Sequence, residues 1–225
     1  AQKRVLSLQP CYDLFAASFT TAELEAIDDA ARGFTAVGYS FDAADDLDNT
    51  AVTPDALGPK TVAGLFLTRH LIRHLPEQFG GVRPVSAVAP GVLATTGMES
   101  LELVRGAVRH VRPACVLAVD ALAAAAPERL CRTFQLSDAG IVPGSGVGNA
   151  RAALQKRTLG VPVFCLGVPT VLDAGTLGGP RGMIVTPRDI DAQVRFLGRV
   201  AADAVNLALH PEISYDDFAQ FIPNR

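Results

Sequence analysis

The chain has 225 residues, of which 49% are hydrophobic and 19% charged, a composition that indicates a folded domain with a substantial core. We expect one domain over residues 1–225. The net charge of −3 and the scatter of lysines and arginines along the chain argue against binding to nucleic acid. No apolar run approaches the roughly 20 residues that span a bilayer, and the N-terminus lacks a signal-peptide pattern, so no membrane partner is expected.

The four cysteines do not form a CxxC pair. They are Cys11, Cys115, Cys131 and Cys165. Two of them lie inside apolar runs, where cysteine behaves as a small hydrophobic residue. We expect reduced thiols in a cytoplasmic protein, with no metal and no cofactor bound.

The first third of the chain predicts an arm, a helix, a strand and an acidic segment. Residues 1–19 have no clean period and are expected to form an extended arm. Thr20 with Glu23 is a capping box that opens a short helix ending at Gly33. Residues 34–41 are expected to form the first core strand. The acids after it, including Asp42 and Asp45, are either a solvated loop or a cation site, although the glycine and glutamate of a calcium loop are missing.

A helix is predicted from Pro59 to Leu75, because apolar residues recur there every three or four positions. Asp55 lies at its N-terminus, where it could cap the helix or be a carboxylate ready to accept a proton. His70 and His74 share one face of this helix, as zinc ligands do, but arginines flank both and favour a simple surface position.

The rest of the chain alternates predicted strands and helices. Strands are expected at residues 85–91, 115–120, 133–136, 161–167 and 183–185. Helices are expected from Thr96 to His110, over residues 121–126 and 150–158, and after a Thr186 cap with Pro187 in the first turn. Because several strands are continuous apolar runs, the pattern predicts an α/β fold with a mostly parallel sheet covered on both faces.

A glycine-rich loop at residues 137–149 is the densest irregular segment of the chain. Three of its four glycines, Gly144, Gly146 and Gly148, are closely spaced but do not have the GxGxxG spacing of a dinucleotide loop, and no lysine completes a phosphate-binding GxxxxGK motif. Gly144 and Gly146 flank Ser145, but GxSxG would need glycines at 143 and 147, so a serine-hydrolase elbow is also excluded.

Four aspartates stand at predicted strand ends or helix starts, namely Asp55, Asp120, Asp138 and Asp173. A carboxyl group beside a buried strand is partly desolvated, and two such groups close together cannot both ionise cheaply. A pair sharing one proton can supply a base that activates water and an acid that protonates a leaving nitrogen. Ordinary helix capping is the alternative reading of these residues.

Seven blocks of sequence, in order, resemble the germination protease family of spore-forming bacteria. They are TPDALGP at 53–59, RPVSA at 83–87, PGV at 90–92 with Thr96 and Gly97, AVDALA at 118–123, QLSDAG at 135–140, PGSGVGN at 143–149 and GVPTVLDA at 167–174. Residues 185–210 are similar to the family's final helix. The N-terminal residues 1–33 match poorly, and only residues 175–182 stand where the family has a long segment, so the chain resembles a shortened, divergent member.

The resemblance implies an atypical aspartic endopeptidase, made as a zymogen, that cleaves small acid-soluble spore proteins at germination. The family's catalytic aspartates fall on Asp55 and Asp120. The fold implied is a three-layer α/β/α sandwich similar to hydrogenase-maturation proteases. The location implied is the cytoplasm of the spore core, with a protein substrate and a possible homo-oligomer.

We assign Asp55 as the base and Asp120 as the acid, although a coupled pair also permits the reverse. Backbone donors of the glycine-rich loop are expected to hold the substrate or the tetrahedral intermediate. The predicted substrate-binding residues are Asp138, Gly144, Ser145, Gly146 and Asn149. Two alternatives remain: a maturation-type peptidase that recognises a metal-loaded substrate through acids such as Asp42, Asp45 or Asp55, and a non-catalytic binding protein.

Overall fold

The structure is a computed structural model that describes residues 4–7, 34–38, 54–91, 93–143, 151–214 and 217–218. Its strands are β1 (Arg4–Ser7), β2 (Phe34–Gly38), β3 (Val85–Val88), β4 (Cys115–Ala124), β5 (Thr133–Ser137), β6 (Val163–Asp173) and β7 (Ile184–Val185). Its α-helices are α3 (Leu57–Ala63), α4 (Arg69–His74), α5 (Pro76–Phe79), α6 (Leu93–Thr96), α7 (Ser100–Val111), α8 (Lys156–Leu159) and α9 (Ile190–Leu209). Short 3₁₀ helices are η1 (Pro54–Ala56), η2 (Pro127–Arg129) and η4 (Ala174–Leu177).

The described strands form one sheet in the order β1-β5-β6-β4-β2-β3, with β7 added to β6. The centre is parallel, since β2 pairs in parallel with both β3 and β4, and β4 with β6. Strands β5 and β7 run antiparallel to β6, and β1 runs antiparallel to β5, so the whole sheet is mixed. The predicted α/β class is confirmed, and part of the predicted N-terminal arm is an edge strand of this sheet.

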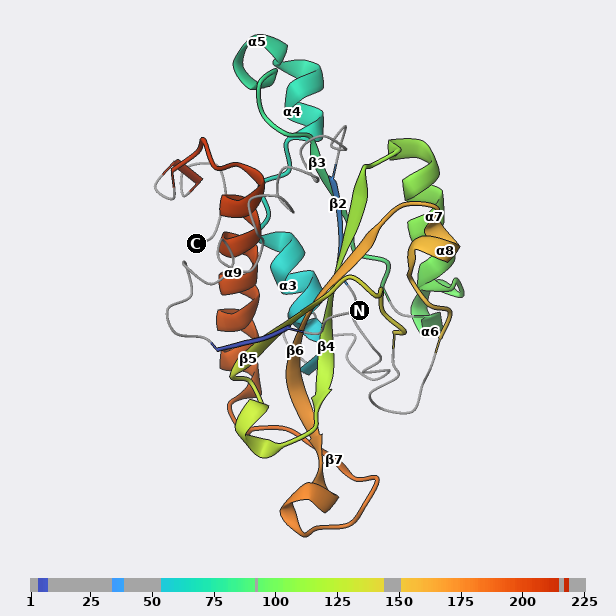
Figure 1. The fold of residues 1–225 in the computed structure, drawn as a ribbon, viewed down its shortest axis with the longest axis vertical. Coiled ribbons are helices and arrows are strands. Elements are labelled where there is room, and N and C mark those ends of the chain that lie inside the picture. Colours follow the sequence, from blue (N-terminus) through green and yellow to red (C-terminus); the bar gives the residue numbers. More distant parts are fainter. Residues whose placement is uncertain are drawn as a thin grey trace.

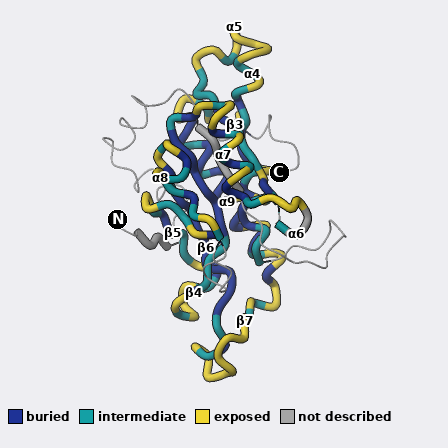
Figure 2. Tube along the Cα trace, turned by 90° about the vertical axis from the view of Figure 1, so that its right-hand side faces the viewer, coloured by how far each residue is buried: buried dark blue, intermediate teal, exposed yellow. Residues whose placement is uncertain are grey.

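Helices cover both faces of the sheet (Figure 1), with α3 and α9 on one face and α7 and α8 on the other. Alternate residues of β4 point to opposite faces, as the strand period requires. Cys115, Leu117 and Val119 belong to the core cluster with α9, whereas Val116 and Ala118 pack with α7. The central strands are therefore buried on both faces (Figure 2), which explains their unbroken apolar sequence.

Helices α3 and α9 approach closely because glycines stand at their contact. A Cβ on Gly64 would lie 2.7 Å from the Ala202 Cβ, and a Cβ on Gly198 would lie 2.7 Å from the Lys60 Cβ. Both distances are too short for a real side chain, so only glycine permits this helix spacing. The result is a closely packed two-helix layer on one face of the sheet.

The single helix predicted from Pro59 to Leu75 is wrong, because it is divided into α3 and α4. The connection is held by Asn206 of α9. Its Nδ2 donates to the Gly64 carbonyl at 2.9 Å, and its Oδ1 accepts from the Phe66 amide at 2.8 Å. A buried side chain from the end of the sequence thus satisfies backbone groups that a continuous helix would have used internally.

The short helix predicted over residues 121–126 is also wrong, since β4 continues as a strand to Ala124. Alanine favours helices in isolation, but the preference is small compared with pairing and packing. Here the continuation pairs with β6 through Leu172, with a register shift after Leu122. Asp120 therefore lies inside β4, and the prediction that the strand ends there is wrong.

Three further helix predictions need correction. The helix expected from Thr96 begins at Ser100 as α7, with Glu99 as its N-cap, because Thr96 ends the separate helix α6. The helix expected over residues 150–158 is reduced to α8, which has Gln155 as its N-cap, because Leu154 instead forms a β-bridge with Ile141. The last helix begins at Ile190 with Asp189 at the N-cap, whereas Thr186 donates its hydroxyl to the Thr170 carbonyl at 2.8 Å. The helix predicted from Thr20 lies outside the described residues.

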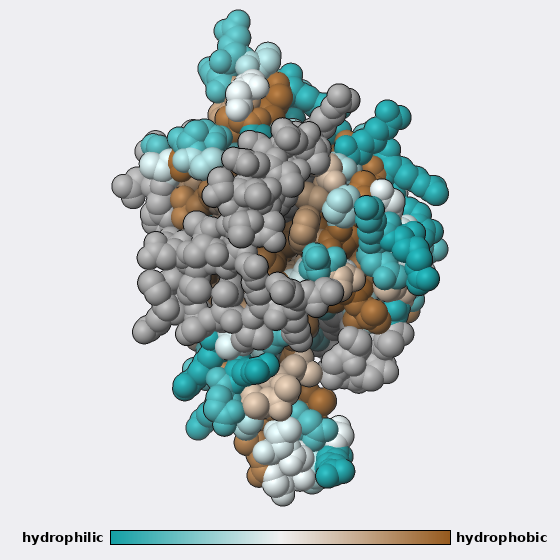
Figure 3. Space-filling model, viewed as in Figure 1, coloured by the Kyte–Doolittle hydropathy of each residue, from teal (hydrophilic) through white to brown (hydrophobic). Residues whose placement is uncertain are grey.

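An arm made of the end of β6, η4 and β7 protrudes from the sheet at the bottom of Figures 1 and 3. Leu177, Met183 and Ile184 on it are 61%, 56% and 42% exposed. The Asp173 carboxylate lies at the base of this arm and accepts hydrogen bonds from the amides of Gly175 at 2.7 Å and Gly182 at 2.9 Å. Among the described helices, none combines the length and the apolar character needed to cross a bilayer.

Candidate active site

Asp120 is a buried carboxyl group within β4, next to the last described pair between β4 and β2. Its side chain is 2% exposed, and its Oδ1 accepts a hydrogen bond from the Ala121 amide at 2.9 Å. The pairing of β4 with β2 ends one residue earlier, at Val119 opposite Gly38, while the pairing with β6 continues. Asp120 is thus the first residue of β4 beyond the described end of β2.

Asp55 reaches the same region from a different element. It lies in η1, at the N-terminal start of α3, and is half-buried. Element η1 packs against β4, β6 and α9. The charge of Asp55 acts on Asp120 and raises the pKa of that carboxyl, so the two acids lie within electrostatic reach of each other.

The environment of Asp120 favours its neutral, protonated form. Burial is the main cause that raises the pKa of Asp120 well above its usual value, and the Asp55 charge adds to it. The hydrogen bond from the Ala121 amide opposes the shift but is the smaller effect compared with burial. These surroundings therefore favour retention of a proton on Asp120, in a region that also holds the charge of Asp55.

The topology of the sheet explains why these two acids meet. From β2 the chain crosses through α3 to β3 on one side, then returns through α7 to β4 on the other side of β2 (Figure 1). The carboxyl ends of β2 and β4 therefore flank a topological switch point, where open α/β sheets bind their ligands. Asp55 follows β2 in the chain and Asp120 lies in β4.

The other two aspartates singled out by sequence do not join this pair. Asp138 is exposed after β5. The backbone amides of Gly182 and Gly175 lower the pKa of Asp173, which is the N-cap of η4. Asp173 is therefore a capping residue, the alternative reading from sequence. Gly144, Ser145, Gly146 and Asn149, like Asp42 and Asp45, lie outside the described residues.

Thiol and metal chemistry find no support in the part of the chain that the structure describes. Burial raises the pKa of Cys115 and Cys131 to about 11 and of Cys165 to about 12, so these thiols stay protonated. No three His, Cys, Asp or Glu side chains among the described residues converge to hold a metal ion. His70 and His74 are exposed on α4.

The segment that carries this pair matches a known protein family. The profile of the germination protease family, Peptidase_A25, matches residues 44–181, a range that contains both Asp55 and Asp120. The chain belongs to the germination protease family. It is accordingly a hydrolase of the peptidase class, with a protein as its substrate.

Individual relatives in this family share a large part of the chain. A germination protease of Clostridium acetobutylicum is 36% identical over 220 residues, covering 78% of this chain and 67% of the relative. One from Geobacillus is 50% identical over 154 residues, covering 68% of this chain and 39% of the relative. An NiFe hydrogenase maturation protease of Thermococcus kodakarensis matches with a TM-score of 0.43 and 17% identity, over 81% of this chain and 97% of that structure.

Two residues that shape the site of this germination protease chain, Gly167 and Leu122, were not recognised from the sequence patterns. Gly167 of β6 pairs with Asp120, and a Cβ there would lie 2.4 Å from the Leu122 Cδ1. The absence of a side chain at Gly167 lets Leu122 lie across β6 on the face that carries Asp120. A glycine within an otherwise apolar strand was the available signal, because such a glycine often marks close approach by another group.

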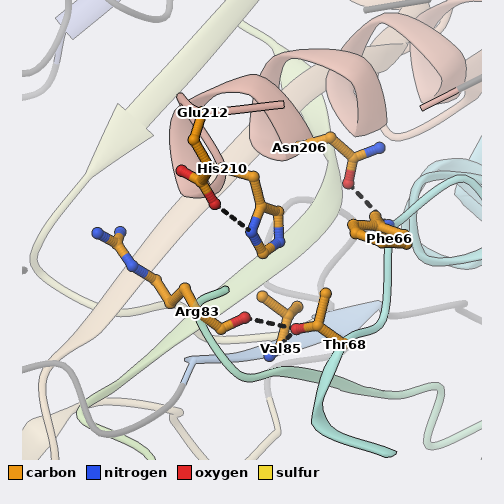
Figure 4. A network of polar contacts seen from close by, with 7 residues as sticks. All are labelled: Phe66, Thr68, Arg83, Val85, Asn206, His210 and Glu212. Atoms are coloured by element: carbon orange, nitrogen blue, oxygen red, sulfur yellow. Dashed lines mark hydrogen bonds and ion pairs between the residues drawn. The ribbon is translucent and has the colours of Figure 1, made fainter. Parts of the chain in front are cut away.

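A second buried polar cluster of this germination protease chain surrounds His210, just after α9 (Figure 4). His210 is 0% exposed, its ring packs edge-on to Phe66, and Phe218 lies alongside. Neither ring nitrogen makes a hydrogen bond of normal geometry with any described residue, although Glu212 lies 3.7 Å from Nδ1. Burial first, and then the charge of Arg83, lower the pKa of His210 to about 4, so the imidazole is neutral.

Proposed function

We propose that this chain is an endopeptidase of the spore-germination type in which Asp55 and Asp120 form the catalytic dyad. The observation that carries the proposal is the buried, proton-holding Asp120 within electrostatic reach of Asp55, at the carboxyl edge of adjacent parallel strands. The relatives are named germination proteases. The resemblance of the sequence blocks to this family is the basis for proposing small acid-soluble spore proteins as substrates and the spore core as the location.

Each carboxyl group has a distinct task in the proposed reaction. Asp55, half-buried at a helix start, acts as the carboxylate that takes a proton from the attacking water. Asp120, which holds a proton, donates a hydrogen bond to the peptide carbonyl oxygen as the tetrahedral intermediate forms. The proton that Asp55 took from water then passes to the leaving nitrogen, and the carbonyl re-forms as the C–N bond breaks. Asp120 keeps its proton, so the pair returns to its singly protonated state. As a coupled pair, the two aspartates also permit the reverse assignment.

The decisive experiment measures cleavage of a purified small acid-soluble spore protein by the wild type, Asp55→Asn and Asp120→Asn. Each substitution is expected to lower kcat/KM by a factor of about 100 to 10,000, the usual contribution of a general acid or base. Asp191→Asn is the matched control, because Asp191 is an exposed aspartate in the first turn of α9. It is expected to cleave like the wild type.

Three outcomes would contradict the proposal. Cleavage that persists in both dyad variants would exclude the aspartate pair as the catalytic group. Cleavage that depends on added nickel and survives substitution of Asp120 would favour the maturation-type peptidase. A chain that binds the spore protein without cutting it would favour the non-catalytic reading.

A further inference from the structure

We infer that Gln135 of β5 is a substrate-contact residue of this site, and that its side-chain oxygen accepts a hydrogen bond from an N–H group of the substrate peptide beside Asp120. This inference rests on the proposed peptidase function and adds a third polar residue to the site. Gln135 is the first residue of the QLSDAG segment and takes no part in the dyad.

Strand register brings Gln135 and Asp120 to one face of the sheet. Gln135 of β5 pairs with Gly167 of β6, and Gly167 pairs in turn with Asp120 of β4. Residues directly opposite each other on paired strands have their side chains on the same face. Because neighbouring strands lie about 4.8 Å apart, the Cα atoms of Gln135 and Asp120 are separated by two such spacings, about 10 Å. Gly167 between them carries no side chain.

The packing of neighbouring residues shows which face of the sheet this is. Leu136 of β5 and Val119 of β4 belong to the core cluster with α9. Gln135 and Asp120 are each one residue away on these strands and therefore point to the other face. Cys165 lies on that other face, in the cluster with α7, and the charge of Asp120 acts on it. The row of Gln135 and Asp120 thus follows directly on the apolar cluster of α7.

The side-chain oxygen of Gln135 has no hydrogen-bond partner, although the residue is buried. Gln135 is 6% exposed, and its Oε1 atom makes no hydrogen bond with any described residue. A buried acceptor without a donor costs stability, because burial removes its hydrogen bonds to water. Buried polar atoms are nearly always paired, so an exception calls for an explanation such as a functional role. A substrate peptide brings suitable donors in its N–H groups.

The exposure of this face increases from the row of Gln135 and Asp120 toward the next row. Leu122 of β4 and Thr133 of β5 lie on the same face one row further on, and both are partly exposed. Leu122 covers Gly167, since a Cβ on that glycine would lie 2.4 Å from the Leu122 Cδ1. Gln135, at 6% exposed, is no more deeply buried than Asp120 at 2%. A substrate that reaches the acid therefore reaches the layer that holds Gln135.

The amide of Gln135 suits a peptide group. Its oxygen is a neutral acceptor that can pair with an N–H group without competing with Asp120 for a proton. Asp120 contacts the peptide carbonyl on one side of Leu122, and Gln135 accepts from a peptide N–H on the other side. Two contacts of opposite polarity fix the position and direction of the peptide relative to the dyad. Gln135 itself transfers no proton.

The first test compares the wild type, Gln135→Met and the control Gln78→Met in cleavage of a purified small acid-soluble spore protein. Methionine is unbranched and flexible like glutamine but has no amide. Because Oε1 has no partner among the described residues, Gln135→Met should be at least as stable as the wild type in urea unfolding. It should lower kcat/KM about three- to tenfold, the loss expected for one hydrogen bond. Gln78 is exposed on α5, so its variant should cleave like the wild type.

The combination of stability and activity distinguishes a substrate contact from a structural role. A lower unfolding midpoint for Gln135→Met would show that a partner within the fold holds the amide, and this would overturn the inference. Unchanged kcat/KM for Gln135→Met would overturn it as well.

The second test identifies the donor on the substrate. Short peptides around the cleavage site are made with one backbone amide at a time replaced by an ester, which removes one N–H group. At one position the ester should lower kcat/KM about three- to tenfold for the wild type and have little effect on Gln135→Met, because the partner is already absent. Strictly additive effects at every position would count against the contact.

A binding measurement separates this inference from the proposed dyad. The same peptides are bound to Asp55→Asn, with and without Gln135→Met, and followed by fluorescence anisotropy. Weaker binding by the double variant, without cleavage by the wild type, would retain Gln135 as a contact and exclude the peptidase. Cleavage that depends on the dyad and is unaffected by Gln135→Met would retain the peptidase and exclude Gln135. Equal binding by both variants without any cleavage would exclude both.

Discussion

Replacing His210 by phenylalanine should flatten the dependence of stability on pH between about 6.5 and 4. In the folded protein His210 is buried and its pKa is lowered to about 4, whereas the unfolded chain has the ordinary value of 6.5. Each unit of difference corresponds to about 1.4 kcal/mol, so the neutral imidazole is linked to about 3 kcal/mol of stability. Phenylalanine keeps an aromatic ring against Phe66 and Phe218 but cannot bind a proton.

The sign follows from which state takes up the proton. Above pH 6.5 the imidazole is neutral in both states, and the full contribution is present. As pH falls below 6.5 the unfolded chain binds a proton at His210 while the folded chain does not, so the unfolded state is favoured increasingly until about pH 4. The described groups that act on the ring are Glu212, which is half-exposed, Arg83, whose charge opposes protonation, and the backbone of Phe66, which favours it.

The measurement is urea unfolding followed by circular dichroism at several pH values from 7 to 4. Between pH 6.5 and 4 the wild type should lose about 3 kcal/mol more than His210→Phe. Because other carboxyl groups titrate in both proteins, only the difference between the two curves reports on His210. The Glu212→Gln variant should still lose stability as the pH falls from 6.5 to 4, as the wild type does. Parallel curves for the wild type and His210→Phe would refute the assignment of a buried, neutral imidazole.

Three further predictions concern the site and its supports. Asp120→Asn should raise the stability of the protein at pH 7 and remove cleavage. Folding raises the pKa of the Asp120 carboxyl group, so the folded protein loses stability as the pH rises through that pKa, and asparagine removes this loss. Unchanged or lower stability at pH 7, measured by thermal unfolding, would contradict a protonated Asp120. Asn206→Ala should cost about 2–4 kcal/mol in urea unfolding, since two buried backbone groups lose their partners, and a cost below about 1 kcal/mol would contradict that role. Gly167→Ala should lower the free energy of unfolding by about 1–3 kcal/mol and lower kcat/KM, because the new methyl group displaces Leu122. The double variant with Leu122→Ala should recover part of that stability, and strictly additive effects of the two substitutions would argue against the contact.

Local sequence patterns pointed to four aspartates, and the family resemblance narrowed these to the two candidate catalytic acids, Asp55 and Asp120. Asp120 follows an apolar run and Asp55 precedes a helical pattern after a proline, and each signal is local. Asp173 carried the same kind of signal and has a different role. Its carboxylate accepts two backbone hydrogen bonds at a turn, and one of the donors, Gly182, lies nine residues away and cannot be anticipated from strand periodicity.

The predicted ends of helices and strands were wrong where the hydrogen-bonding partner comes from a distant part of the chain. The helix predicted through Leu75 is interrupted because Asn206 binds backbone groups 140 and 142 residues away. Residues 121–124 form a strand because β6 pairs with them, although alanines favour a helix locally. Neither interaction can be recognised from the sequence of the segment itself.

By itself, the sequence determined the α/β class, the family and the two acids of the candidate site, because apolar runs, capping residues and short motifs are local properties. The tertiary structure shows that Asp120 is buried within electrostatic reach of Asp55, that Gly167 makes room for Leu122, and that β4 continues along β6 to Ala124. These features depend on which strands become neighbours and how deeply each side chain is buried. The pKa of a carboxyl group and the pairing of a strand are set by surroundings that come from distant parts of the chain.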